Sequence, residues 1–351
     1  MNYYENDIYR KELEVIVEST PSIESLAGKT VVISGARGLI GSMLIDAVLF
    51  ANRAKELDCK VYGIVRNIEK ARERFSQYVD DENFELVKAD INKDEIQIED
   101  DIDYFIHGAS NTHPIYYATR PIETIRTNTI GTDHTLEFAV RHNCKRYIFL
   151  SSVEIYGENR ENKEKFTEDY CGYIDCNTLR AGYPEGKRLG ESLCQAYRKE
   201  YGLDCVIARL ARCYGAGLLE EDSKALTQFV KRAVAGEDVV LKSEGKQYYS
   251  YVYVADAVNA LLILLFNGSD GGAYNVVGKN SDVTLKDLAD MIANEVKRKV
   301  VFDLPDRIES EGYSKATRAL LDGHKLMDLG WEAKYEMVDA VRRTIRILRS
   351  S

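Results

Sequence analysis

The stretch TVVISGARGLIGSMLIDAVL, residues 30–49, decides the fold. Residues 30–34 form an apolar, β-branched run that is typical of a buried strand, and a helical pattern begins after the glycines. Glycines at three-residue spacing allow a tight turn and a close approach of the backbone to a phosphate at the helix N-terminus. The stretch therefore predicts a strand–loop–helix unit that binds a dinucleotide. We expect the loop to touch it through Gly35, Arg37, Gly38, Leu39, Ile40 and Gly41.

Apolar strands and helices alternate along the chain beyond this unit. Strands of continuous apolar character are typical of a parallel sheet that helices cover on both faces. The pattern predicts an α/β fold with a Rossmann-type doubly wound parallel sheet. Its expected strands are 30–34, 61–65, 84–89, 103–110, 146–152 and 205–211, and its long helices are 121–142 and 180–201.

Past residue 212 the pattern loosens into shorter strands and helices, which indicates a second, smaller unit. We therefore expect three parts: an N-terminal helical extension over 1–27, a dinucleotide-binding Rossmann domain over 28–211 with 250–270 interleaved, and a C-terminal α/β substrate-binding domain over 212–249 and 271–351.

Composition narrows the class of protein. The net charge of -10 argues against a nucleic-acid or anionic-membrane surface. The longest apolar run, 260–266, is too short to span a bilayer, and the N-terminus lacks a signal-peptide pattern. The 7 cysteines stand singly, without a C-x-x-C, and the 5 histidines lack metal-ligand spacing. We expect a cytoplasmic protein with reduced thiols, no metal site and no membrane partner.

A proton-transfer set follows in the middle of the chain. In RAGYPEGKRLGE, Lys187 comes four residues after Tyr183, so a helix would place both side chains on one face. A neighbouring ammonium favours tyrosinate over phenol, whose pKa is otherwise about 10. Ser152, at the end of an upstream strand, adds a hydroxyl that orients an alcohol or carbonyl. The set predicts acid–base chemistry at a carbinol or carbonyl carbon.

The end of the second strand bears on the choice of cofactor. An acidic residue there usually holds the ribose 2′-hydroxyl of NAD, but this strand is followed by Arg66. With Arg37 in the glycine loop, two guanidinium groups suit a 2′-phosphate. We therefore favour NADP(H), with NAD(H) as the alternative. The cofactor is also expected to contact Asp90 and Ile91 after the third strand, and Gly108, Ala109 and Ser110 after the fourth.

These motifs together resemble the extended short-chain dehydrogenase/reductases, the NAD(P)-dependent nucleotide-sugar epimerase/dehydratase family. The resemblance covers roughly 28–348 and rests on GARGLIG, HGAS (107–110), the segment around Asn128, SSVEIYG (151–157), YPEGK and RLARCYGAG (209–217). It implies hydride transfer at the carbon of a nucleotide-linked sugar, with Tyr183 as acid and base and Lys187 on the nicotinamide ribose. It also implies a homodimer through 121–142 and 180–201. The implied contacts are Asn128 to the cofactor, and Thr112, Ser152, Arg209, Lys224 and Tyr249 to the substrate.

Departures from the family pattern bear on the reaction. Family dehydratases carry an Asp-Glu pair after the Ser/Thr, whereas this chain has Val153 and Glu154, which makes dehydration the last choice. The Ser-x-Glu order, with Glu154 as a catalytic residue, is closer to UDP-glucuronate decarboxylases. Tyr249 stands where the family commonly has an Arg that grips the diphosphate, so other basic residues are needed there.

Two segments, 221–245 and 313–331, resemble a bacterial subgroup of surface-glycan enzymes that includes reductases of CDP-linked ketopentoses. Epimerase or reductase chemistry therefore ranks before decarboxylation. A non-catalytic dinucleotide-binding scaffold is the alternative of a different class, and the presence of both Tyr183 and Lys187 argues against it.

Overall fold

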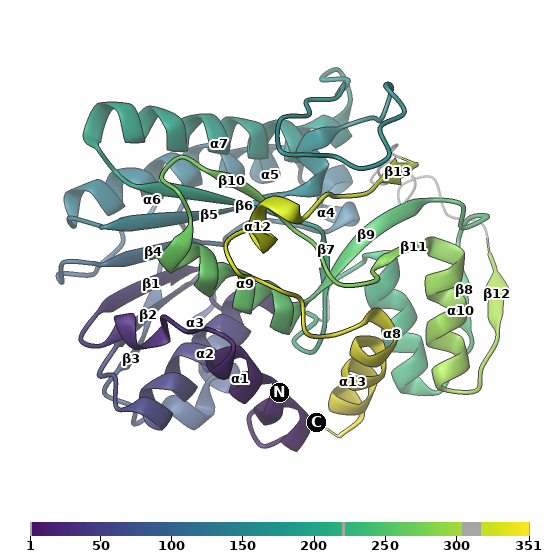
Figure 1. Ribbon diagram of the computed structural model, residues 1–351, viewed down its shortest axis with the longest axis horizontal. Helices are drawn as coiled ribbons and strands as arrows, with labels where there is room; N and C mark the ends of the chain where they lie inside the picture. Colours follow the sequence, from purple (N-terminus) through teal and green to yellow (C-terminus); the bar gives the residue numbers. More distant parts are fainter. Residues whose placement is uncertain (1, 220–221, 304–316, 351) are drawn as a thin grey trace.

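A seven-stranded sheet forms the centre of the computed structural model, which describes residues 2–219, 222–303 and 317–350 (Figure 1). The strand order is β10-β6-β5-β4-β1-β2-β3, and all its strand pairs are parallel. The bounds are β1 Thr30–Ser34, β2 Lys60–Val65, β3 Phe84–Lys88, β4 Tyr104–His107, β5 Arg146–Ser152, β6 Cys205–Leu210 and β10 Ala273–Val276.

Helices cover both faces of this sheet, which confirms the predicted doubly wound fold (Figure 1). The helices α5, α6 and α7 pack together on one side, and α1, α2 and α9 pack together on the other. Because the central strands are buried on both faces, their sequences are continuously apolar. The bounds are α1 Asp7–Glu18, α2 Leu39–Lys55, α3 Ile68–Arg74, α4 Pro114–Thr119, α5 Pro121–Asn128, α6 Ile130–Arg141, α7 Gly182–Tyr201 and α9 Val254–Asn267.

The N-terminal helix α1 is anchored to the sheet domain by a buried polar cluster. Asn6 caps the helix by accepting from two backbone N–H groups. The Tyr9 hydroxyl donates to Asp46 of α2 over 2.6 Å, and Arg74 of α3 forms an ion pair with the same carboxylate. The Asp46 side chain is 0% exposed and that of Arg74 is 8% exposed. The predicted N-terminal extension is therefore part of the packed structure.

A smaller α/β part lies beside the carboxyl ends of the large sheet (Figure 1). Strand β9 pairs with β7, β11 and β13, and β8 pairs with β12. The bounds are β7 Arg212–Tyr214, β8 Val239–Leu241, β9 Tyr248–Tyr253, β11 Asp282–Thr284, β12 Val300–Phe302, β13 Arg318–Ala319, α8 Ala225–Ala235, α10 Leu285–Glu295, α12 His324–Met327 and α13 Met337–Arg349.

The structure differs from the expected element boundaries in three places. The helix expected over 121–142 is broken at Thr129 (φ -117°, ψ -75°), which separates α5 from α6. Strand β10 joins the large sheet, although the expected limits assign 271–351 to the substrate part. Strand β9 joins the small sheet, although 250–270 was assigned to the Rossmann part. Short apolar strands do not reveal which sheet they enter, because that depends on distant partners.

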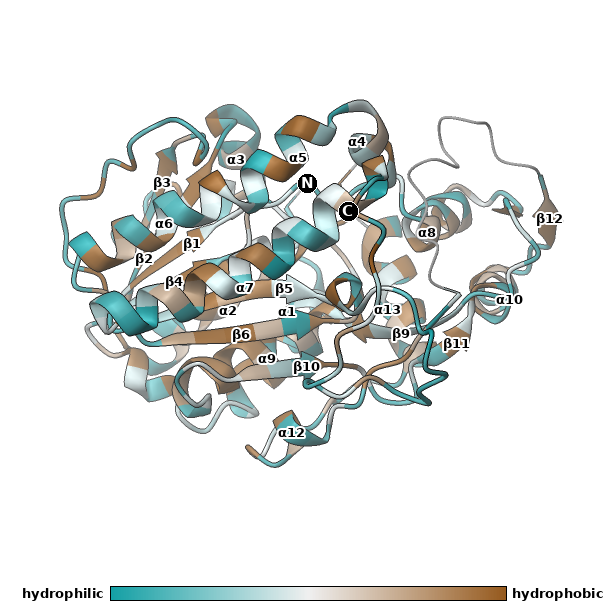
Figure 2. Cartoon of the chain, turned by 90° about the horizontal axis from the view of Figure 1, so that it is seen from above, coloured by the Kyte–Doolittle hydropathy of each residue, from teal (hydrophilic) through white to brown (hydrophobic). Residues whose placement is uncertain are grey.

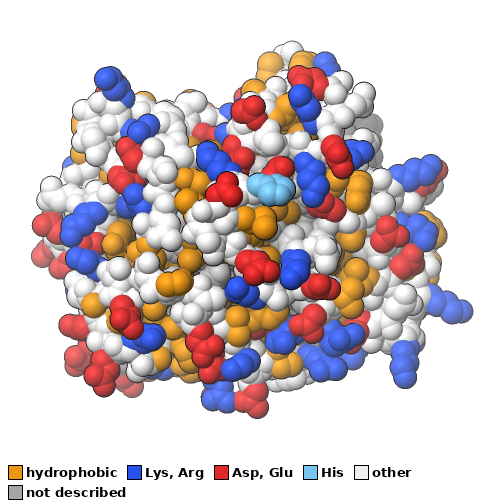
Figure 3. All heavy atoms as spheres, viewed as in Figure 1, with side chains coloured by type: hydrophobic (Ala, Val, Ile, Leu, Met, Phe, Trp, Pro, Cys, Tyr) orange, Lys and Arg blue, Asp and Glu red, His pale blue; other side chains and the backbone are white. Residues whose placement is uncertain are grey.

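Three features are absent from the described part of the surface and helices. Within the described ranges, the helices are too short or too polar to cross a lipid bilayer. Charged side chains of both signs are interspersed on the face that Figure 3 shows, where a continuous basic patch is not seen. Clusters of three or more potential metal ligands are also absent from the described ranges.

Candidate active site

The glycine loop between β1 and α2 fits a dinucleotide. Gly35 has a φ of +72°, and a Cβ there would lie 2.7 Å from the carbonyl group of Gly108. A Cβ on Gly41 would lie 2.5 Å from the carbonyl oxygen of Gly35. The two close contacts require glycine and keep the loop against α2. The loop lies where β1 separates strands that run outward in opposite directions, which is the crevice where open α/β sheets bind ligands.

A cavity of about 560 Å³ starts at this loop and continues to the smaller α/β part. Side chains or backbone from β1, β4, β5, α7, α8 and β9 line it. The structure therefore brings most of the predicted site together. The predicted residues on the lining are Gly35, Gly38, Leu39, Ile40, Gly41, Gly108, Ser110, Thr112, Ser152, Glu154, Tyr183, Lys224 and Tyr249.

The predicted proton-transfer residues meet at the end of β5. Ser152 ends this strand, and Tyr183 is in the first turn of α7, where the Ser152 hydroxyl lies close enough to the Tyr183 hydroxyl to influence its pKa. One turn later, Lys187 is 3% exposed, and its Nζ donates to the carbonyl oxygen of Leu150 over 2.7 Å. The ammonium also lies 4.8 Å from the centroid of the Phe149 ring. The sequence spacing thus correctly predicted the helix face.

The electrostatics of the set differ from the expectation. Burial raises the pKa of Tyr183 to about 12, although the hydrogen bond with Ser152 opposes that shift. Burial also lowers the pKa of Lys187 to about 7, although the Glu191 carboxylate opposes that shift. We expected Lys187 to lower the pKa of Tyr183, but this ammonium is engaged with Leu150. In the protein alone, Tyr183 is therefore a phenol at neutral pH and can donate a proton.

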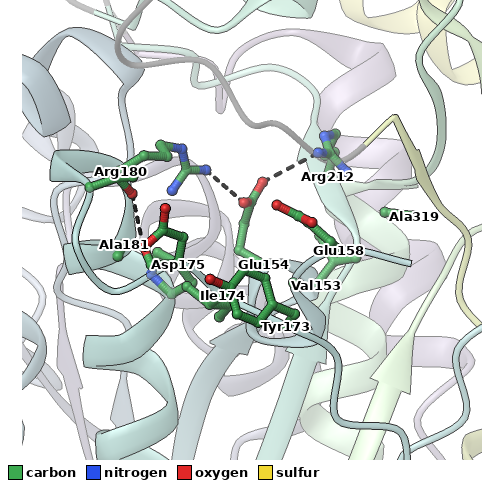
Figure 4. A pocket seen from close by; sticks show the side chains of 13 residues that line it. Val153, Glu154, Glu158, Tyr173, Ile174, Asp175, Arg180, Ala181, Arg212 and Ala319 are labelled. Carbon is green, nitrogen blue, oxygen red and sulfur yellow. Dashed lines mark hydrogen bonds and ion pairs between the residues drawn. The ribbon is translucent and has the colours of Figure 1, made fainter. Parts of the chain in front are cut away.

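Two arginines that sequence reasoning missed converge on Glu154, which is two residues after Ser152 (Figure 4). Arg180 donates to its Oε2 over 2.6 Å, and Arg212 donates to its Oε1 over 3.2 Å. Among the residues that the structure describes, three buried N–H donors of these guanidinium groups have no hydrogen-bond partner: Nε and Nη1 of Arg180, and Nη1 of Arg212. The carboxylates of Glu158 and Asp175 line the same pocket (Figure 4). The signal in the sequence was Arg180, three residues before Tyr183.

Aromatic rings hold these arginines in place. The Arg180 guanidinium lies 4.7 Å from the ring centroid of Tyr117, which stacks on the Tyr183 ring at 5.0 Å. The Arg212 guanidinium lies 3.5 Å from the ring centroid of Tyr249. The position where the family commonly has arginine therefore carries a tyrosine that supports an arginine from the neighbouring strand β7.

A further group on the cavity lining was also missed. The His113 Nδ1 lies 3.2 Å from a carboxylate oxygen of Asp222, and the Lys224 ammonium approaches the same carboxylate at 3.2 Å. Burial raises the pKa of Asp222, but hydrogen bonding to His113 and the charge of Lys224 outweigh burial and hold it well below its usual range. These contacts connect the N-terminus of α4 to the segment before α8.

Arg209 does not belong to the described cavity lining, so its expected substrate role stays a prediction. It makes bidentate contacts to Glu191, at 3.0 and 2.7 Å, and donates to the carbonyl oxygen of Glu168 over 2.6 Å. Its position at the end of a buried strand explains these contacts, because a buried guanidinium requires a carboxylate partner.

Other predicted cofactor residues lie beside the described lining and not on it. Asn128 accepts from Ser110 over 2.9 Å and so holds a residue that does line the cavity. Arg66 follows β2 and forms an ion pair with Glu123 at 2.8 Å. The remaining ones are Arg37 between the loop glycines, Asp90 and Ile91 after β3, Ala109 after β4, and Lys187. Residues 221 and 313–316 of the two subgroup segments lie outside the described residues.

His107 of the HGAS motif connects neighbouring elements of the fold through buried polar contacts. It is fully buried, and its Nδ1 lies 2.8 Å from the Ser34 hydroxyl, while its Nε2 lies 3.3 Å from the Thr132 hydroxyl. Burial lowers its pKa well below the usual range, so the ring is neutral. It joins β1, β4 and α6 beneath the glycine loop.

Known proteins share the sequence features of this chain. The profile of the NAD dependent epimerase/dehydratase family matches residues 31–277. UDP-glucuronic acid decarboxylase 1 of Danio rerio is 30% identical over 342 residues, which covers 96% of this chain and 77% of the relative. UDP-glucuronic acid decarboxylase 3 of Arabidopsis thaliana is 30% identical over 313 residues, with 88% and 85% coverage.

Solved structures share the fold at lower identity. A dTDP-glucose 4,6-dehydratase from Streptomyces venezuelae, solved with NAD bound, has a TM-score of 0.79 at 22% identity and covers 92% of this chain and 97% of its own. A UDP-glucuronic acid 4-epimerase from Bacillus cereus has a TM-score of 0.78 at 19% identity, with 92% and 99% coverage. With a family profile over most of its length and a glycine loop of the required shape, this chain belongs to the NAD dependent epimerase/dehydratase family.

Proposed function

We propose that the protein exchanges a hydride and a proton at a carbinol or carbonyl carbon of a nucleotide-linked sugar, with NAD(P) as its cofactor. The observation that carries the proposal is the Ser152–Tyr183 hydroxyl pair on the lining of a cavity that starts at the glycine loop. Two relatives of this chain are named as UDP-glucuronic acid decarboxylases, which supports a nucleotide-sugar substrate.

In the proposed reaction the cofactor exchanges the hydride, and residues of the chain position the substrate and exchange the proton. The glycine loop would hold the pyrophosphate of the dinucleotide, whose nicotinamide would supply or accept the hydride when bound. Ser152 holds the reacting oxygen through its hydroxyl. In reduction, Tyr183 donates its phenolic proton to the oxygen of the carbonyl, and in oxidation the tyrosinate takes that proton back. In the protein alone the Lys187 Nζ donates to Leu150, and we propose that a protonated Lys187 stabilises the tyrosinate once cofactor and substrate are bound.

The far part of the cavity suits the charged portion of such a substrate. Lys224, Arg232 and Lys242 contribute cationic side chains, and Gln228 and Gln247 contribute amides. Cations and amides of this kind bind a diphosphate and the polar edge of a base. We propose that the nucleotide lies against α8 and β8, with the sugar toward Tyr183.

Binding and turnover with a panel of nucleotide sugars test this proposal. UDP-, dTDP- and CDP-linked hexoses, pentoses and glucuronate would be titrated into the protein with NAD or NADP, and products would be identified by mass spectrometry. At least one nucleotide sugar is expected to bind and to be converted, with the free monosaccharide inactive. Failure of the whole panel to bind would refute the substrate class.

Decarboxylation of a nucleotide-linked glucuronate is the second candidate, and the cluster of Glu154, Arg180 and Arg212 favours it (Figure 4). Oxidation at the carbon next but one to the carboxylate creates a β-keto acid that loses carbon dioxide readily. The N–H donors of the two arginines that have no partner in the described part of the chain suit the carboxylate of such a substrate. Release of labelled carbon dioxide from UDP-glucuronate would distinguish this reaction from simple epimerisation or reduction, which retain every carbon.

For the cofactor, we propose a preference for NADP(H) through Arg66 and Arg37. The Arg66 side chain is 58% exposed, and an exposed ion pair such as Arg66–Glu123 is worth at most about 1 kcal/mol. The 2′-phosphate of NADP carries about two negative charges and can bind the Arg66 guanidinium in a bidentate way, so it competes well with Glu123 for Arg66.

Arg66→Ala should therefore weaken NADP binding by at least about tenfold and change NAD binding little. Glu123→Gln, which frees Arg66, should tighten NADP binding. Isothermal titration measures both dissociation constants. Tighter binding of NAD than of NADP, unaffected by Arg66→Ala, would contradict the proposal.

We also propose a homodimer formed through α5 and α7. Apolar side chains are exposed on this face: Ile122, Ile125, Leu179 and Leu189 are 43–65% exposed, and Figure 2 shows the brown stretches on both helices. An apolar face of this kind is typical of a protein–protein contact. Light scattering should give twice the chain mass of 39.8 kDa, and Leu189→Glu should reduce it to one chain mass. A monomeric parent protein would refute the dimer.

The proposed compartment is the cytoplasm. All seven cysteines are free thiols, which agrees with a reducing environment.

A further inference from the structure

Helix α7 carries a carboxylate on the same face as its two proton-transfer residues. Tyr183, Lys187 and Glu191 follow one another at four-residue spacing, so their side chains lie above each other along one face. Lys187 donates to the carbonyl oxygen of Leu150, and Glu191 accepts from the hydroxyl of Ser151 over 2.5 Å. The ammonium and the carboxylate are thus attached to consecutive residues of β5.

The Glu191 carboxylate is fixed from its other side. Arg209 contacts both of its oxygens, and the two side chains are each 12% exposed. Arg209 is itself held by Tyr156, whose hydroxyl accepts at 3.1 Å, and by the carbonyl oxygen of Glu168. With this many donors around it, the carboxylate keeps one position. Such a network is more than a surface salt bridge, since it ties α7 to β5 and β6.

We propose that Glu191 is a positioning residue for proton transfer: its fixed carboxylate holds the charged form of Lys187 in place behind Tyr183. This role deepens the proposed function and rests on it, because the charge on Lys187 matters to catalysis only if Tyr183 exchanges protons. Nothing in the reaction itself is assigned to Glu191.

The charges around Lys187 support this role. His107 faces it from β4 and is neutral, Tyr183 is a phenol, and Cys194 is a buried thiol on α7. Among the described groups that act on Lys187, Glu191 is the one carboxylate. Without it, burial alone would favour the neutral amine.

The titration of Lys187 tests the proposal without any need for turnover. In protein labelled with ¹³C at lysine Cε, the signal of Lys187 is assigned by its loss in Lys187→Met, and its midpoint is followed by NMR. Glu191→Gln is expected to lower that midpoint by about one pH unit or more. The alkaline limb of the activity profile should move to lower pH by the same amount once a substrate is known.

Matched variants separate this role from a purely structural one. Glu185→Gln removes an exposed carboxylate of the same helix and should leave the midpoint in place. Should Glu191→Gln alone not fold, Glu191→Gln with Arg209→Gln removes both buried charges and should give a smaller downward shift, because the lost Arg209 cation partly offsets the lost carboxylate. An unchanged Lys187 midpoint in either folded variant would overturn the proposal. A shifted midpoint without any nucleotide-sugar turnover would retain it and instead contradict the proposed function.

Discussion

Replacing Tyr183 by phenylalanine is expected to lower kcat by about three orders of magnitude while substrate binding changes little. General acid–base catalysis by a positioned side chain raises the rate roughly 10²- to 10⁴-fold. The Tyr183 hydroxyl lies beside Ser152 on the cavity lining, where it can serve as this acid and base. The phenylalanine ring can keep the stacking on Tyr117, which is 5.0 Å between ring centroids in the parent protein. The variant therefore loses the phenolic proton but keeps the shape of the site. Steady-state kinetics and titration calorimetry measure the two quantities.

Tyr117→Phe is the matched control for this variant. It removes a phenolic hydroxyl from the ring stacked on Tyr183 but leaves the proposed acid in place, so its kcat should stay within about tenfold of the parent value. If Tyr183→Phe retained full turnover, or if both variants lost activity equally, Tyr183 would not be the acid and base.

Asp46→Ala should destabilise the folded chain by about 3–5 kcal/mol. The substitution leaves the Arg74 guanidinium buried without its carboxylate and removes the acceptor of the Tyr9 hydroxyl. Removal of one partner from a buried ion pair typically costs this much, because the remaining charge is uncompensated. Urea unfolding followed by circular dichroism measures the loss in the free energy of unfolding.

Two further variants make this stability prediction specific. Glu14→Gln removes a carboxylate of an exposed pair on the same helix α1 and should leave the unfolding curve unchanged. Asp46→Leu with Arg74→Met replaces the buried pair by apolar groups and should recover most of the lost stability. Equal stability of Asp46→Ala and the parent protein would show that the cluster does not anchor α1.

The fold could be predicted largely from local pattern. Residues 30–49 gave the correct strand, loop and helix because glycine chemistry and β-branched runs are local signals. The break at Thr129 and the sheets joined by β9 and β10 depend on packing with distant segments, which a single sequence does not display.

The candidate site was predictable where a spacing carries the chemistry. Tyr183 and Lys187 are one helical turn apart, and Ser152 stands at the end of a predicted strand. The sequence therefore predicted that the three residues lie close together. The convergence of Arg180 and Arg212 on Glu154 did not follow, because the three come from separate elements. The raised pKa of Tyr183 was missed for the same reason, since burial depends on the whole fold.

Hydride transfer in a single turnover tests the central claim most directly. The protein, loaded with its cofactor and mixed with the nucleotide sugar identified by the panel, is followed at the absorbance of the reduced nicotinamide in a stopped-flow instrument. The parent protein should show a transient or net change, and Tyr183→Phe should bind the same substrate yet change at least about 10²-fold more slowly. Equal rates in the two proteins would contradict the account.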